Sequence, residues 1–194
     1  AIQDLLAAGR DLGWPLVLKI DDAAIAHKSD QGGVFIGLRD EEEALVAWNA
    51  LRQRHPAAPV IVQAMETGTE IILGMTTDPD FGPLITLGLG GVFAEILRDT
   101  TTLLPPYSPA TARRALESLQ AFPLLTGARA RPPADLDALC ALISRFSAFA
   151  AGAADHLREI EINPVLAGPK GAVAVDCIAL RQTPKQKEAA RHGQ

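Results

Sequence analysis

The chain has 194 residues, of which 48% are apolar and 21% charged, and its 18 basic and 23 acidic side chains give a net charge of −5. The apolar content excludes a disordered chain, because it is ample to offset the entropy lost on folding. The acidic balance excludes a general nucleic-acid or anionic-membrane surface. Proline or glycine interrupts the apolar runs before the roughly 20 residues of a membrane helix, so no membrane partner is expected.

The two cysteines, Cys140 and Cys177, lie far apart in the sequence, each within an apolar stretch. This pattern favours two buried small hydrophobic residues in a reducing compartment over a disulfide. The first residues are typical of an amphipathic helix with charges throughout and not of a signal peptide. We therefore expect a cytoplasmic protein.

Helical spacing, capping residues and turn signals predict the elements in chain order. The first are helix 1–12, strands 15–20 and 33–38, helix 41–54 with a capping pattern at Asp40 and Glu43, and strands 59–65 and 70–77. After the turn at 78–83 come the apolar run LITLGLGG, a helix from Ser108 to about Leu119, a helix over 135–151, and strands 156–167 and 171–180. This irregular order predicts an α+β protein of two lobes, 1–65 and 66–181, with a polar tail over 182–194.

A first candidate for phosphate binding is Lys19, the one charge in the apolar strand 15–20. Its ammonium could bind phosphate oxygens, or it could reach solvent from a sheet edge. The polar loop that follows ends in Gly32 and Gly33, whose N–H groups could converge on an anion while Lys28 adds charge. An ordinary surface turn would have the same residues, and no P-loop or dinucleotide-binding glycine motif is present.

A second candidate lies on the last two predicted strands. Glu161 and Asn163 are two residues apart and share one face of a strand, and Asp176 lies in the apolar run of the returning strand. A carboxylate there is costly unless it is paired or binds a cation, and oxygen ligands of this kind suit Mg²⁺. The alternative is an aspartate that accepts hydrogen bonds from a turn. Glu70 also begins a strand, where a solvated side chain is the simpler interpretation.

Four blocks of sequence together resemble a known family. They are LVLKI…HKSDQGGV, VQAM…GTEIILGM, DPDFGPLITLGLGGVFAEIL and REIEINPVL…AVD. They look like the ATP-grasp domain of NDP-forming acyl-CoA synthetases, which are relatives of the succinyl-CoA synthetase β subunit, and the resemblance spans about residues 1–181. It implies the ATP-grasp fold, in which two α/β lobes hold a nucleotide in the cleft between them.

The resemblance also implies roles for single residues. His27 would relay a phosphoryl group between the acyl-CoA module and the nucleotide, and neutral imidazole is a competent nucleophile near pH 7. Asn163 and Asp176 would bind Mg²⁺, with Glu161 beside them. The residues that would bind ATP or ADP are Lys19, Lys28, Gly32, Gly33, Gln63, Met65 and Glu70, with Gln63 and Met65 on the adenine side.

The implied reaction is acid + CoA + ATP ⇌ acyl-CoA + ADP + phosphate, through an acyl phosphate and a phosphohistidine. This chain would supply the nucleotide half, and CoA-binding and phosphohistidine modules of the same or a partner chain would supply the rest. The chain alone would then bind nucleotide without completing the synthesis. Family members usually carry further residues before this start, so part of the first lobe is expected to be absent.

One residue departs from the family pattern, because Leu103 stands where an arginine is usual. If that arginine holds phosphate or a neighbouring module, activity would be weakened. An alternative from another class is a regulatory ATP-grasp-like domain of a protein lysine acetyltransferase, and a third is a protein-interaction lobe without Mg²⁺-dependent nucleotide affinity. The presence of Asn163, Asp176, Gly32 and Gly33 favours a competent synthetase domain.

Overall fold

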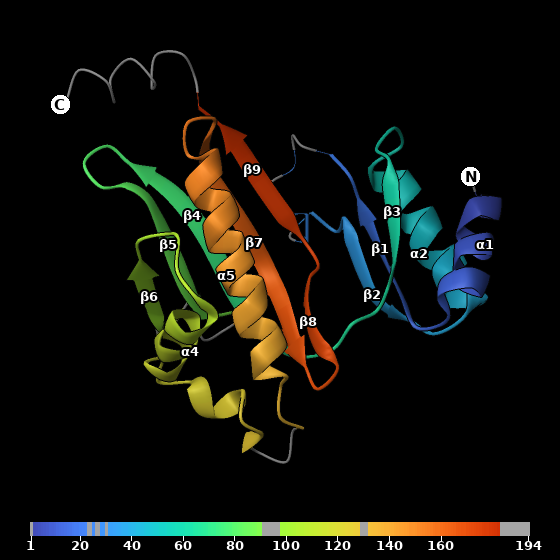
Figure 1. Ribbon diagram of the computed structural model, residues 1–194. Helices are drawn as coiled ribbons and strands as arrows, with labels where there is room; N and C mark the ends of the chain where they lie inside the picture. The colour runs from blue at the N-terminus through green and yellow to red at the C-terminus, as the bar shows by residue number, and fades with distance from the viewer. Residues whose placement is uncertain are drawn as a thin grey trace. The chain divides into compact units, whose positions relative to one another are not determined.

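The computed structural model describes residues 2–22, 25, 28, 29, 31–90, 98–128 and 132–182. Contacts within the chain divide it into two compact units, Ala1–Glu66 and Thr67–Gln194. We call them unit 1 and unit 2 and describe each by itself (Figure 1).

Unit 1 is a three-stranded antiparallel sheet in the order β2-β1-β3, with two helices on one face (Figure 1). Its elements are α1 (Ile2–Leu12), β1 (Leu16–Ile20), β2 (Val34–Leu38), α2 (Glu41–Arg54) and β3 (Val60–Ala64). Leu16, Leu18 and Ile20 of the central strand are fully buried in the core that α1 and α2 cover. These elements confirm the helices and strands predicted for this part of the chain.

The other face of this sheet carries the alternate residues of the strands. Val17 and Lys19 of β1 lie on it, opposite Gln63 and Ile61 of β3. Ile36 of β2 pairs with Val17 and is 66% exposed. We call this the open face of unit 1.

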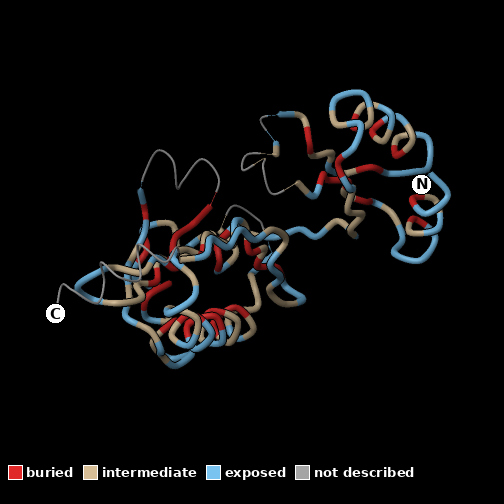
Figure 2. Tube along the Cα trace, turned by 90° about the horizontal axis from the view of Figure 1, so that it is seen from above, coloured by how far each residue is buried: buried red, intermediate tan, exposed pale blue. Residues whose placement is uncertain are grey.

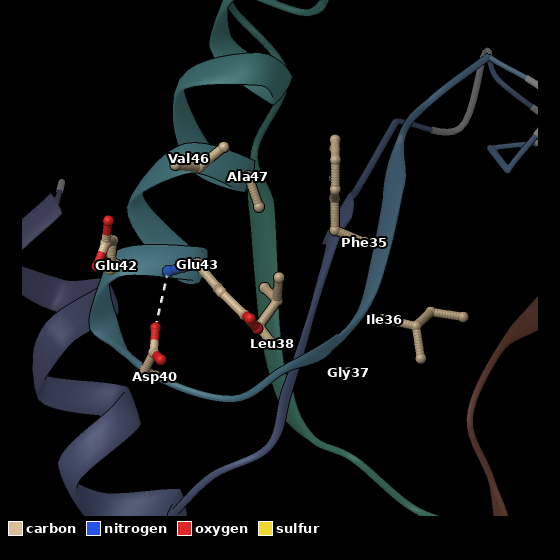
Figure 3. A pocket seen from close by; sticks show the side chains of 9 residues that line it. All are labelled: Phe35, Ile36, Gly37, Leu38, Asp40, Glu42, Glu43, Val46 and Ala47. Atoms are coloured by element: carbon tan, nitrogen blue, oxygen red, sulfur yellow. Dashed lines mark hydrogen bonds between the residues drawn. The ribbon is translucent and has the colours of Figure 1, made fainter.

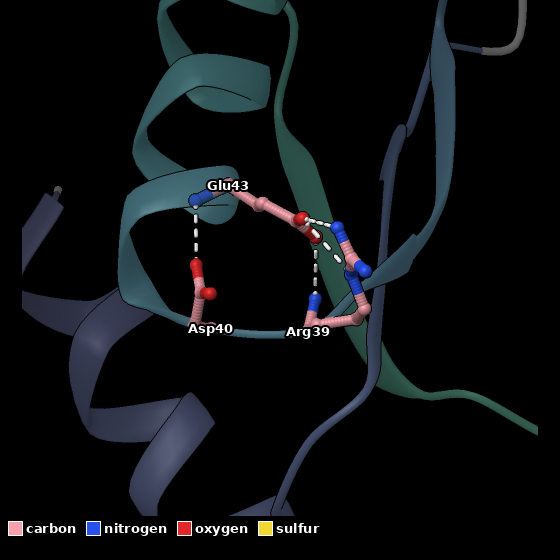
Figure 4. A network of polar contacts seen from close by, with 3 residues as sticks. All are labelled: Arg39, Asp40 and Glu43. Atoms are coloured by element: carbon pink, nitrogen blue, oxygen red, sulfur yellow. Dashed lines mark hydrogen bonds and ion pairs between the residues drawn. The ribbon is translucent and has the colours of Figure 1, made fainter.

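Helix α2 begins at a cap that the sequence predicted. The Asp40 carboxylate accepts a hydrogen bond from the Glu43 amide at 2.9 Å. Glu43 in turn accepts hydrogen bonds from the backbone amide and the guanidinium of Arg39 (Figure 4). These hydrogen bonds from Arg39 hold the pKa of Glu43 below its usual value. The hydrogen bonds among Arg39, Asp40 and Glu43 therefore hold the turn between β2 and α2.

Unit 2 is built on a six-stranded sheet whose path runs β6-β5-β4-β7-β8, with β9 also paired to β7. Its strands are β4 (Thr69–Asp78), β5 (Gly82–Leu89), β6 (Thr100–Leu103), β7 (Leu157–Gly168), β8 (Gly171–Ala174) and β9 (Cys177–Arg181). The helices are α4 (Pro109–Glu117), the short 3₁₀ helix η1 (Phe122–Leu124) and α5 (Leu136–Ala153). Figure 1 shows α5 lying across one face of the sheet.

The core of unit 2 lies between α4, α5 and this sheet face. Ile71, Leu73 and Met75 of β4 are fully buried in it, and the buried residues of α5 lie along the helix at helical spacing (Figure 2). By length and composition alone, α5 could cross a membrane, contrary to the expectation from the sequence. Its buried face packs against the core as that of a core helix does.

Three predictions for unit 2 need correction. The single strand predicted over 171–180 is interrupted at Val175 and Asp176, because β8 and β9 pair with successive parts of β7. Strand β6 was not predicted, since its three threonines and one leucine form a short, half-exposed edge. Cys140 is buried as expected, but Cys177 is exposed on the edge strand β9, and both thiols are free.

Candidate functional site

Lys19 lies in the middle strand of the unit 1 sheet. It faces Val34 of β2 and Ile61 of β3, and only 7% of it is exposed. Lys19 is therefore not a surface lysine at a sheet edge. A buried lysine on the sheet face opposite α1 and α2 is a suitable point charge for an anion.

The loop after β1 closes on itself through its own backbone. The Gly33 amide donates to the Lys28 carbonyl at 2.7 Å, and the Gly32 amide donates to the Ser29 carbonyl at 3.1 Å. In this arrangement both N–H groups therefore donate within the loop, and their convergence on an anion stays a prediction. His27, the predicted catalytic residue, lies outside the described residues.

Both glycines of this loop are needed for close packing. A β-carbon on Gly33 would stand 2.6 Å from Cδ1 of Ile20 and 2.9 Å from the Lys28 carbonyl oxygen. Gly32 has φ +62, in the left-handed region that favours glycine. The glycines therefore fix the loop against the end of β1, directly after Lys19.

The residues predicted on the adenine side lie at the end of β3. Gln63 is paired with Val17 and is half-buried. Met65 follows the strand, where its amide donates to the Pro15 carbonyl at 3.0 Å. Gln63 therefore shares the open face of unit 1 with Lys19, and Met65 is held against the start of β1.

Glu70 is near the start of β4 in unit 2. Its carbonyl accepts a hydrogen bond from the Gly90 amide at 2.7 Å, and a β-carbon on Gly90 would stand 2.9 Å from Cβ of Glu70. Gly90, directly after β5, thus lets the backbone approach Glu70 closely. Sequence reasoning gave the glycine-rich run LITLGLGG no role, although its glycine spacing was the available signal.

The three predicted metal ligands lie on or beside β7. The side-chain amide of Asn163 donates to Oε1 of Glu161 at 3.1 Å, which confirms that the two side chains share a face. Asp176 lies in the interruption between β8 and β9. Its neighbour Val175 donates to the Pro164 carbonyl at 3.1 Å, and Cys177 pairs with Ile162. The register therefore brings Asp176 alongside Asn163.

This donor set fits Mg²⁺ by its chemistry. Two carboxylates and an amide supply oxygen atoms, and Mg²⁺ takes only one or two protein carboxylates because water and substrate phosphates complete its shell. Among the described residues, no group of three or more His, Cys, Asp or Glu side chains is arranged to hold a metal. Of the three residues, two are carboxylates and one is an amide, so this finding is compatible with such a site.

Leu103, where the resemblance implies an arginine, lies on the other face of the unit 2 sheet. It pairs with Ile85, whose side chain is fully buried, and it packs against the core that α4 and α5 cover. Glu161 pairs with Gly74, which alternates with the buried Leu73 and Met75. Leu103 and Glu161 therefore lie on opposite faces of the sheet.

Cavities formed by other described residues also occur in both units. One, of about 450 Å³, lies in unit 1 between β2 and the start of α2, and Figure 3 shows the Ile36 side chain at its rim pointing away from the helix. The other, of about 310 Å³, lies in unit 2 and is lined by Thr67, Gly68, Thr69, Pro132, Ala167, Gly168 and Pro169. No predicted site residue lines either cavity.

Comparison with known proteins gives the family. A family profile described as an ATP-grasp domain matches residues 2–179. The chain belongs to the ATP-grasp family. It is 37% identical over 174 residues to the β subunit of ADP-forming acetate–CoA ligase I of Pyrococcus furiosus, which covers 86% of this chain and 75% of that subunit. The β subunit of ligase II of the same organism is 34% identical over 185 residues, 90% of this chain and 78% of that subunit.

Solved structures agree with this assignment. The dinucleotide-forming acetyl-coenzyme A synthetase 1 of Ca. Korarchaeum cryptofilum, in complex with coenzyme A and Ca-AMPCP, superposes on 94% of this ATP-grasp chain and 82% of its own with a TM-score of 0.85 at 34% identity. The chain spans only 25% of longer relatives such as the 4-hydroxybutyrate–CoA ligase of Nitrosopumilus maritimus. The alternative interpretation as a regulatory domain of a protein lysine acetyltransferase has no support in these comparisons.

Proposed function

We propose that this ATP-grasp chain is the nucleotide-handling domain of an ADP-forming acid–CoA ligase. In that role it transfers a phosphoryl group between ATP or ADP and a histidine. Its relatives of similar length are β subunits of ADP-forming acetate–CoA ligases. The observation that carries the proposal is the register that brings Asp176 alongside Asn163 and Glu161, because it assembles an oxygen donor set from β7 and from the interruption between β8 and β9.

Different residues of the chain bind the phosphates, the base and the metal ion in this proposal. Lys19 neutralises phosphate charge from the open face of unit 1, and Gln63 on the same face contacts the base. Asp176 and Asn163 hold Mg²⁺ in unit 2, with Glu161 hydrogen-bonded to Asn163. When bound, Mg²⁺ neutralises the charge that develops on the transferring group. Lys28 and Glu70 are the remaining polar nucleotide contacts that we propose.

We assign His27 the role of phosphoryl acceptor. One solved relative, at 34% identity, carries a phosphohistidine segment that points towards its nucleotide-binding site in a complex with Mg-AMPPCP. In the proposed reaction, an imidazole nitrogen of His27 attacks the γ-phosphorus of ATP as the bond to the ADP leaving oxygen breaks. The phosphoryl group then passes to a histidine of the phosphohistidine module, in the same or a partner chain, as the bond between phosphorus and the His27 nitrogen breaks.

The first test is incubation of the chain with Mg²⁺ and ATP labelled in the γ-phosphate. We expect label that is released by acid and retained in base, as for a phosphohistidine. His27→Asn should remove the label while the variant keeps its affinity for Mg-ATP. Label on the His27→Asn variant would contradict the relay role. A folded chain without affinity for Mg-ATP or Mg-ADP in calorimetry would contradict nucleotide handling altogether.

A further inference from the structure

The loop over residues 28–33 lies near two basic side chains that could bind a phosphate. Its glycine amides donate to carbonyls within the loop, so they have no N–H left for a phosphate. Positive charge near the loop must therefore come from side chains. One of these is Lys28, within the loop. The last turn of α2 supplies another, because Arg54 lies against Gly32.

Gly32 makes room for the Arg54 guanidinium. A β-carbon added at Gly32 would overlap Nη1 of Arg54 and would stand 3.1 Å from its Cζ. The left-handed backbone at Gly32 and this contact exclude a side chain at the same position. The guanidinium thus lies directly on the loop backbone.

A neighbouring residue ties the loop to the same helix end. Nε2 of His55, the C-cap of α2, lies 3.2 Å from the Gln31 carbonyl and donates a hydrogen bond to it. The His55 amide donates to the Leu51 carbonyl within the helix at 2.7 Å. The hydrogen bond from His55 therefore links the loop to the helix end directly beside Arg54.

The Arg54 side chain is exposed, and among the described residues no carboxylate forms an ion pair with it. By contrast, Arg39 pairs with Glu43 and Arg113 pairs with Asp137. Arg52, on the same helix as Arg54, stacks on Trp48 and donates a hydrogen bond to the Ala58 carbonyl. Arg54 is thus an exposed, positioned guanidinium without an ion pair to any carboxylate that the structure describes.

We propose that Arg54 is a further phosphate-binding residue of this domain, placed against the 28–33 loop by Gly32 and by the hydrogen bond from His55. The proposal rests on the function proposed above. The guanidinium presents a planar fork of N–H donors that matches phosphate oxygens. It supplies the phosphate contacts that the occupied glycine amides cannot supply. Its ligand is the polyphosphate of the nucleotide.

A simpler role for Arg54 is stabilisation of the helix end, because cations in the last turn interact favourably with the helix dipole. That role predicts a lower melting temperature on substitution and no change in nucleotide affinity. The proposal predicts a change in affinity that depends on the phosphates of the ligand. The two roles therefore differ in what calorimetry measures.

The experiment compares Arg54→Gln, Arg54→Lys and the wild-type chain by calorimetric titration with Mg-ATP, Mg-ADP and adenosine. Arg10→Gln is the matched control, because Arg10 is an exposed helical arginine of the same unit that donates only to the Leu6 carbonyl one turn earlier. Melting curves verify that each variant is folded. We expect Arg54→Gln to weaken Mg-ATP and Mg-ADP at least about tenfold, with the affinity for adenosine unchanged. Arg54→Lys should restore part of the loss.

The outcomes separate this proposal from the proposed function. If wild type binds Mg-ATP and the affinity of Arg54→Gln for Mg-ATP is within about twofold of the wild-type value, Arg54 serves only the helix end. The proposal is then overturned. An equal loss for adenosine and Mg-ATP would overturn it too, because it would indicate general damage to the unit. If neither wild type nor Arg10→Gln binds Mg-ATP, the proposed function fails, and this proposal fails with it.

Discussion

Asn163 donates its side-chain N–H to Oε1 of Glu161 across 3.1 Å, along a single strand of the unit 2 sheet. Because the amide nitrogen is used in this bond, the amide oxygen is the atom of Asn163 that remains for a cation. In the proposed site the hydrogen bond would therefore orient Asn163 as a metal ligand, with Glu161 as its positioning partner. Asp176 reaches the same place from the next strands, through their register with β7.

The first prediction concerns Asp176. We expect Asp176→Asn to abolish the Mg²⁺ dependence of nucleotide binding, because the variant loses the charge that holds the cation. Calorimetric titration with Mg-ATP, with and without excess chelator, measures this dependence. Asp80→Asn, in the exposed turn between β4 and β5, is the matched control. Unchanged Mg²⁺ dependence in Asp176→Asn would show that the metal is bound elsewhere.

The second prediction concerns Lys19. Lys19→Met keeps a side chain of similar length in the buried strand and removes its charge. We expect the affinity for Mg-ATP to fall at least about tenfold, since a charge-assisted contact to phosphate is lost. Lys170→Met, in the exposed turn before β8, should leave the affinity unchanged. Equal affinities for both variants would mean that Lys19 does not contact the nucleotide.

The third prediction concerns Leu103, where the resemblance implies an arginine. Because Leu103 lies on the face of the sheet opposite Glu161, Leu103→Arg should leave the affinity for Mg-ATP within about twofold of wild type. The variant should be less stable, because an arginine there must carry its charge past a half-buried apolar surface. A gain in affinity with Leu103→Arg would contradict the placement of this side chain.

The fourth prediction concerns Tyr107, whose buried hydroxyl has no hydrogen-bond partner among the described residues. Burial raises the pKa of Tyr107 to about 12. The folded state therefore binds the phenolic proton more tightly than the unfolded state, whose tyrosines titrate near 10. The stability from this group is complete below pH 10 and should be lost as pH rises through 12.

Two measurements test this behaviour of Tyr107. Denaturant unfolding at a series of alkaline pH values should show the decline in wild type and a smaller decline in Tyr107→Phe. Near neutral pH, Tyr107→Phe should raise the free energy of unfolding by about 1 kcal/mol, because an unsatisfied buried hydroxyl is removed. A loss of stability in Tyr107→Phe at neutral pH would indicate that the hydroxyl has a partner.

Local patterns were sufficient to predict most of the fold from the sequence. The cap at Asp40 and the helical spacing that follows it fixed α2 over the residues that the structure shows. The alternation of β7 was enough to place Glu161 and Asn163 on one face. These features depend on neighbours a few residues away, which is why a single sequence contains them.

Features that depend on distant partners could not be predicted in this way. The threonines of β6 carry no apolar alternation, so this strand forms only because β5 offers an edge to pair with. The exposure of Cys177 follows from its place on an edge strand, which the apolar run around it concealed. The carbonyl partners of the Gly32 and Gly33 amides also depend on how the loop folds back.

Asp176, the proposed metal ligand, lies in the interruption between β8 and β9 and not in a regularly paired strand of the sheet. One side of β7 is paired with β8 and β9 in succession, and Asp176 lies at the junction, where regular pairing is suspended. An aspartate at this position does not interrupt a regular ladder of hydrogen bonds between strands. Its replacement by another residue therefore removes no hydrogen bond of such a ladder. With Asp176 as the proposed metal ligand, the domain can therefore lose or change that ligand and keep its architecture, so evolution can silence or retune such a site without first finding a new fold.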